Sequence, residues 1–138
     1  MARTPPPERR KKMDERNYIT FPIAKKLSEA GIRMESECGW ISDRTSTGIV
    51  NTLLPMKDIH GAYYPAYTFT ELLDVLPVRI EDSNNDYSTF CLRYEKGNNE
   101  AWVGYQNYIK DELCAATNPN PADAAALLLI WLKGGKGE

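Results

Sequence analysis

The feature that most constrains the fold is a run of nine apolar residues, 124–132, that follows a complete helix start. Asn120 stands at the N-cap position, followed by Pro121 and, in the first turn, Asp123. This order is typical of a helix N-terminus, and it predicts a helix over residues 121–133. A helix that is apolar all round is normally covered all round. We therefore expect a sheet on one side and either another helix or a second copy of the chain on the other.

Two earlier segments also predict helices. Thr68 and Glu71 have the spacing of a capping box, which predicts a helix over residues 69–76. Apolar residues recur at helical spacing over residues 21–30, with Thr20 as the candidate N-cap. The helix over 69–76 has only about two turns, so it depends on packing against other elements.

Strands are expected in two parts of the chain. Three candidates lie between the second and third helices, over residues 78–82, 87–95 and 100–108. The turns between them are short, which implies antiparallel pairing. Two shorter candidates, 38–41 and 48–54, flank a polar loop. The expected fold class is α+β, with a small, mainly antiparallel sheet of three to five strands and about three helices packed on one face.

Residues 1–16 differ in composition from the rest of the chain. They are proline-rich and then charged, with little to bury, which predicts a disordered or extended tail before a single domain over residues 17–138. The tail has a net charge of +3 and the remainder has −5. Contact with nucleic acid is therefore expected only through the basic residues between Arg3 and Arg16, and a solubilising tail is the alternative.

The residues that most often perform chemistry do not form a recognisable set. Cys38, Cys91 and Cys114 are far apart and lack metal-ligand spacing, and the single histidine, His60, has no second ligand nearby. We expect no metal, no cofactor, no disulfide framework and no enzymatic activity. Cys91 is interpreted as a small core residue and His60 as a surface or turn residue. The chain shows neither a signal peptide nor a run of the ~20 apolar residues that span a membrane, and the cysteine pattern favours a reducing compartment.

The alternation of residues along the strands predicts one candidate ligand-binding surface. If the apolar residues at alternate positions face the helices, then Arg79, Arg93 and Trp102 share the opposite face. Two guanidinium groups beside an indole can clamp an anion and stack on a base, so a nucleotide is a candidate ligand. The same side chains can instead stack on one another in water as cation–π pairs.

Aromatic residues predict a second surface. Tyr63, Tyr64 and Tyr67 lie in one segment, and tyrosine offers contact area at low entropic cost, so this loop suits a protein partner. Structural packing around Pro65 is the alternative. Trp131, in the apolar last helix, is the candidate contact of a possible homodimer.

The order of these segments also resembles a known group of proteins. The segments that match are IAKKLSEAG, YPAYT, ELLDVLP and the terminal ADAAALLLIWL. Over residues 18–133 the chain is similar to small accessory proteins encoded by tailed phages and prophages. The resemblance implies a bacterial cytoplasmic setting and a binding role, with no catalytic residues to transfer. The expected function is therefore non-enzymatic binding of a host or phage protein, with nucleotide binding as the alternative and nucleic-acid contact through the tail as a weaker one.

Overall fold

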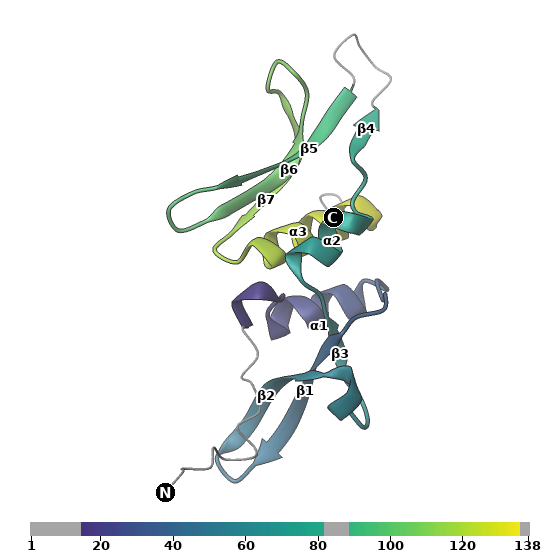
Figure 1. The fold of residues 1–138 in the computed structure, drawn as a ribbon, viewed down its shortest axis with the longest axis vertical. Helices are drawn as coiled ribbons and strands as arrows, with labels where there is room; N and C mark the ends of the chain where they lie inside the picture. The colour runs from purple at the N-terminus through teal and green to yellow at the C-terminus, as the bar shows by residue number, and fades with distance from the viewer. Residues whose placement is uncertain (1–14, 82–88, 136–138) are drawn as a thin grey trace, which may run out of the picture.

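The computed structural model describes residues 15–81 and 89–135, and its elements form successive layers along the long axis (Figure 1). A four-stranded sheet lies at one end, followed by helices α2 (Phe69–Val75) and α3 (Pro121–Ile130). Helix α1 (Phe21–Glu29) and a three-stranded sheet complete the stack. All strand pairs within the two sheets are antiparallel. The α+β class is confirmed, but the strands are divided between two sheets.

The four-stranded sheet contains the three strands predicted between the second and third helices. Its order is β4-β5-β6-β7, with bounds Arg79–Glu81, Thr89–Lys96, Ala101–Gln106 and Glu112–Asn118. Strand β7 was not predicted. The third predicted strand ends two residues early because Asn107 makes a turn, in which its side-chain oxygen accepts from the N–H groups of Ile109 and Asp111, at 3.2 and 2.8 Å.

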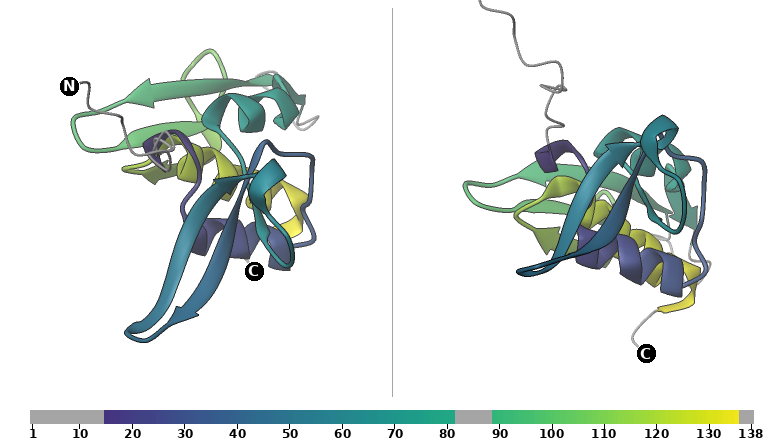
Figure 2. Two further views of the ribbon diagram at one scale, coloured as in Figure 1. Left: turned by 60° about the horizontal axis from the view of Figure 1, so that its bottom comes forward. Right: turned by 90° about the horizontal axis from the view of Figure 1, so that it is seen from below.

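The three-stranded sheet has the order β2-β1-β3, with bounds Gly48–Pro55, Cys38–Thr45 and Tyr64–Ala66. The predicted strands at 38–41 and 48–54 are present. Strand β1 continues to Thr45, into the segment expected to be a polar loop, whereas β2 begins at Gly48 as predicted. Strand β3 pairs with β1 only from Cys38 to Trp40. Beyond Trp40 the β1–β2 hairpin is therefore a two-stranded ribbon, and it extends away from the body of the protein (Figure 2). We call residues 42–51 the arm.

Helix α2 begins as its sequence predicts. The Thr68 hydroxyl oxygen accepts from the N–H of Glu71 at 3.1 Å, and the Glu71 carboxylate accepts from the N–H of Thr68 at 2.9 Å. Both bonds of the capping box are thus present. Helix α1 ends at Glu29 with Ala30 as its C-cap, and Gly31 follows with φ of +81°, a conformation that glycine adopts at little cost.

Helix α3 is covered from within the chain. Its buried residues extend around the helix, and it packs on β6 and β7 of the four-stranded sheet. Helices α1 and α2 contact it from the other side. The sequence predicted that either another helix or a second copy of the chain covers this side of α3, and the structure shows helices there. The missing polar stripe of α3 therefore does not require a dimer.

A buried carboxylate joins α1 to α3. Asp123 accepts from the N–H and from the hydroxyl of Thr20, both at 2.8 Å. Thr20 does occupy the N-cap position of α1, but its side chain donates to α3 and makes no bond to its own helix. Asn120 adds a second bond between the two segments, from its side-chain nitrogen to the carbonyl of Tyr18 at 2.9 Å. None of the described helices is both long and apolar enough to cross a membrane.

Candidate functional site

The alternation predicted for the four-stranded sheet is confirmed. Phe90, Val103 and Tyr105 are buried on the side of α2 and α3. Arg93 and Trp102 lie on the opposite face, as does Arg79, which pairs with Cys91. No described helix or strand covers this face (Figure 1), and we call it the open face.

The three predicted ligand-binding residues form a line across the open face. Arg79 is on β4, Arg93 is on β5 and Trp102 is on β6, and each is displaced by two residues along the strands from the one before. With the usual spacings of a sheet, the Cα atoms of Arg79 and Trp102 are roughly 16 Å apart. Arg93 lies between them. The geometry is thus an extended strip and not a compact cluster.

Along the strands, a carboxylate lies at each end of the pair of arginines. The Glu81 carboxylate is 3.9 Å from the Arg79 guanidinium, and both side chains are about two-thirds exposed. Glu95 shares the face of Arg93 and lies directly opposite Trp102 on the neighbouring strand. The four charges sum to zero, so the open face lacks the positive potential that would attract a free anion.

Gly104 lies beside Arg93 on the open face, and it serves the contact between two strands. A Cβ atom at this position would lie 2.5 Å from Cβ of Ala115 and 2.6 Å from the carbonyl oxygen of Cys114. The glycine therefore allows β6 and β7 to approach closely, and it leaves no hollow for a ligand. Cys91, interpreted from the sequence as a core residue, is exposed on this face because the alternation of the strand places it there.

The tyrosine loop is only partly available to a partner. Tyr67 is 1% exposed, so the prediction that it contacts a partner is wrong. Its hydroxyl accepts from the N–H of Met34 at 2.8 Å and lies 3.2 Å from the carbonyl of the same residue. Burial raises the pKa of Tyr67, in keeping with its place in the core.

The other predicted contact residues are half-buried and belong to separate places. The guanidinium of Arg33 lies 4.9 Å above the ring of Tyr63. Tyr64 packs edge-on against Phe21 of α1, with ring centroids 5.6 Å apart. Trp131 packs against the core just beyond α3. Helix α1 lies between this helix and β3 (Figure 1), so the structure does not bring Trp131 and the tyrosines into one surface.

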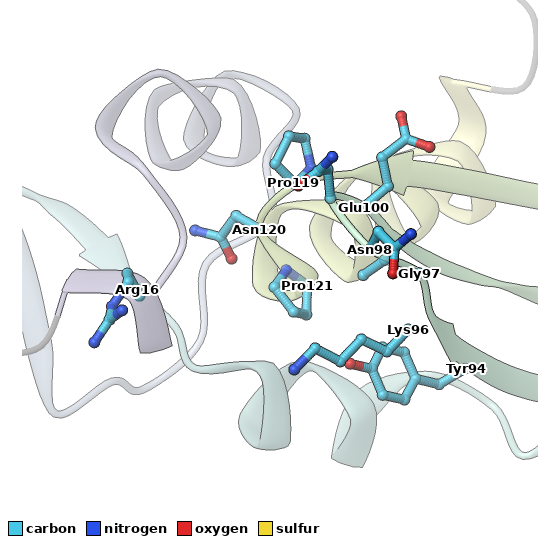
Figure 3. A pocket seen from close by; sticks show the side chains of 11 residues that line it. Arg16, Tyr94, Lys96, Gly97, Asn98, Glu100, Pro119, Asn120 and Pro121 are labelled. Carbon is cyan, nitrogen blue, oxygen red and sulfur yellow. The ribbon is translucent and has the colours of Figure 1, made fainter.

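A cleft of about 460 Å³ was not predicted. Arg16 lines it from a short 3-10 turn (Glu15–Asn17), while Tyr94 and Lys96 extend from the β5–β6 hairpin (Figure 3). Pro119 and Pro121 line it from the start of α3. Its walls come from segments far apart in the chain, and no local motif marks them.

The cleft is poorly suited to an anion despite its two cationic side chains. The first N–H groups of α3, those of Ala122 and Asp123, already donate to the side-chain oxygen of Asn120, at 2.8 and 3.4 Å. Pro121 has no N–H to offer. A helix N-terminus binds anions through such N–H groups, and here they are occupied. We assign no ligand to the cleft.

The strongest pKa shifts belong to buried packing groups. Burial raises the pKa of the Cys114 thiol to about 11, which makes it a poor nucleophile. Burial likewise raises the pKa of Tyr105, whose hydroxyl donates to the carbonyl of Pro77 at 2.7 Å. The hydrogen bond with Cys38, at 3.5 Å, raises the pKa of Tyr18. His60 is exposed, as the sequence predicts.

Comparisons with protein-family models, with curated proteins and with solved structures find no match. In residues 15–81 and 89–135, no group of three or more histidine, cysteine, aspartate or glutamate side chains is placed to hold a metal ion. The inference of function therefore depends on the surfaces described above.

Proposed function

We propose that the protein is a non-enzymatic binding protein that acts through a protein partner. The open face is the observation that supports this most, because it presents an indole and two guanidinium groups on a regular sheet. Tryptophan and arginine are enriched among the residues that dominate protein interfaces. The resemblance to tailed-phage accessory proteins supports a role in the bacterial cytoplasm, with a host or phage protein as the partner.

The charge pattern favours a protein partner over a nucleotide. A nucleotide phosphate would meet Glu81 beside Arg79, and Glu95 on the same face as Arg93. A folded partner can match this mixed set of charges with charges of its own, and such complementarity gives specificity. Nucleotide binding through Arg79, Arg93 and Trp102 remains the second candidate.

Capture of partners by paired variants tests the proposal. The tagged wild-type protein is compared with Arg93→Ala/Trp102→Ala and with a control, Lys25→Ala/Lys57→Ala, which removes two exposed charges outside the open face. The protein enriched by the wild type and the control is then purified and its affinity measured by calorimetry. We expect the open-face variant to bind it at least about tenfold more weakly. Equal affinity of both variants would remove the open face as the contact surface.

Thermal-shift measurements separate the nucleotide alternative. Mono-, di- and cyclic nucleotides should leave the melting temperature unchanged if the partner is a protein. A rise that Arg93→Ala abolishes would instead favour the nucleotide. The weaker alternative, nucleic-acid contact through the basic tail, predicts salt-sensitive association that is lost when residues 1–16 are deleted. Residues 1–14 of that segment lie outside the described residues.

A further inference from the structure

One strand edge lacks the features that usually protect an edge from pairing. In the described structure β2, β3, β4 and β7 each pair on one side only, and so does β1 beyond Trp40, where it contains Asp43 and Arg44. Strands β3 and β4 have three residues each, and they contain a proline and two charges, respectively. Strand β7 contains Glu112 and lies beside a register shift at Tyr105 and Gln106. Short length, proline, charge and bulges are the devices that block edge pairing.

Strand β2 has none of these devices along its pairing length. It has eight residues, no charged side chain and an unbroken register with β1, and its proline is its last residue. Exposed apolar side chains add to this, since Ile49 is 65% exposed and Val50 is 45% exposed. A two-stranded ribbon is only marginally stable by itself in water, and a third strand is the usual remedy.

The hydrogen-bonding groups of β2 that point away from β1 can be identified. Pro65 has no N–H, so its pair with Gly39 is not a hydrogen-bonded pair, and Gly39 directs its N–H and C=O toward β2. The bond from Met56 N–H to the carbonyl of Glu37, 2.9 Å long, fits the same alternation. Within the arm, Ile49 and Asn51 therefore direct their backbone groups to the unpaired edge.

We propose that β2 pairs with β2 of a second copy of this chain, antiparallel and about a two-fold axis at Val50. The two sheets would merge into one sheet of six strands. In this register Val50 faces the partner subunit's Val50 as a non-hydrogen-bonded pair. Ile49 exchanges backbone hydrogen bonds with the partner subunit's Asn51, and Asn51 does so with the partner subunit's Ile49.

A second copy fits this edge for two reasons. The strand has no charge, so two copies side by side create no like-charge repulsion. The outer edges of the merged sheet would be the two β3 strands, which have three residues each and contain Pro65, and, beyond Trp40, β1 with its charged residues Asp43 and Arg44. Further addition is blocked there, so the pairing closes as a symmetric dimer and does not continue into a fibre.

Sedimentation of edge variants tests the dimer. At tens of micromolar the wild type should sediment with twice the 15.6 kDa mass of one chain, and dilution should return it to the monomer. Val50→Lys places two lysines against each other across the axis and should remain monomeric with an unchanged melting temperature in dilute solution. The matched control, Thr117→Lys on the exposed edge of β7, should dimerise like the wild type. A wild type that is monomeric throughout, or a Val50→Lys variant that dimerises fully, would overturn the proposal.

Cross-linking tests the register. Cα atoms of a non-hydrogen-bonded antiparallel pair are about 4.5 Å apart, which a disulfide can bridge. Val50→Cys in a Cys91→Ser background should form a covalent dimer on mild oxidation, while Thr117→Cys in the same background should not. Equal yields at the two positions would refute pairing at Val50. The residue that both tests probe, Val50, lies on the arm and outside the open face, and Thr117 and Cys91 serve only as control and background, so failure of the dimer is separate from failure of the proposed partner binding.

Discussion

The two sheets differ in what supports them. The four-stranded sheet is backed by α2 and α3, and Val103 and Tyr105 are fully buried in that contact. The three-stranded sheet is buried only at its base, where Trp40 and Leu53 face the core, and its arm is exposed. Similar antiparallel strands thus contribute to the core in the four-stranded sheet and form an exposed ribbon in the three-stranded one. Support by helices, and not the strand pattern itself, decides which strands have one buried face and which are exposed on both faces.

The largest expected effect concerns the bond that joins α1 to α3, on which the layered arrangement depends. Asp123→Ala leaves the N–H and the hydroxyl of Thr20 without their acceptor. We expect the free energy of unfolding to fall by about 3 kcal/mol, because unpaired polar groups stay desolvated. Chemical denaturation measures this. Asp123→Asn keeps an acceptor for the N–H and is the matched control, and a loss as large as that of alanine would contradict the role of the acceptor.

The same carboxylate makes stability depend on pH. Burial raises the pKa of Asp123 above its ordinary value of 3.8, although the bonds from Thr20 oppose this. The native state then holds the proton more tightly than the unfolded chain does, so protonation favours folding. The contribution of Asp123 is therefore greatest below pH 3.8 and declines as the pH rises through the native pKa. The free energy of unfolding of the wild type and of Asp123→Asn should be measured as the pH rises from below 3.8 to neutrality. We expect the wild type to lose stability relative to the variant as the pH rises.

The second effect tests how closely the strands of the helix-backed sheet are packed. Gly104→Ala places a methyl group within 3 Å of Cys114 and Ala115, two residues of the neighbouring strand. We expect a loss of about 2 kcal/mol, because backbone cannot move aside as a flexible side chain can. Urea denaturation measures it. The control, Thr117→Ala, changes an exposed position on β7 and should cost little.

A smaller loss of stability is expected from removing a hydrogen bond between this sheet and the segment that follows α2. Tyr105→Phe removes the hydroxyl that donates to the carbonyl of Pro77 but keeps the buried ring. The cost should be about 1 kcal/mol, the usual net value of one hydrogen bond. Thermal unfolding of this variant beside Tyr94→Phe, whose ring is 40% exposed, separates the buried hydroxyl from an exposed one. Equal melting temperatures would show that water replaces the bond at Pro77.

Local signals predicted the parts of the fold that local chemistry determines. The capping box at Thr68 and the Asn120 start of α3 are formed by residues within one turn, so the sequence identifies them. The faces of Arg93 and Trp102 also follow from alternation alone. At Cys91 the position in the strand outweighs the residue type. A cysteine is typical of the core, but the alternation of the strand places this one on the exposed face.

Features that depend on distant segments could not be predicted. Thr20 and Asp123 are separated by 103 positions, and nothing near Thr20 indicates that its hydroxyl donates to another helix. The sequence does not distinguish Tyr67 from the half-buried Tyr63 and Tyr64, but Met34 supplies the backbone groups that bind the Tyr67 hydroxyl in the core. The part of the arm that belongs to β1 was interpreted as a loop because a strand exposed on both faces lacks apolar alternation.

The smallest change in the free energy of unfolding is expected for a substitution in the arm. This substitution tests the contrast between the two sheets most directly. Ile49→Thr keeps a β-branched residue suited to a strand and removes apolar surface that is already largely exposed. At low micromolar concentration, where single chains dominate, the free energy of unfolding should change by less than about 0.5 kcal/mol. Leu53→Ala, at the buried base of the same strand, should cost about 3 kcal/mol. If both substitutions cost the same, the arm would be part of the cooperative core, and the contrast between the two sheets would be lost.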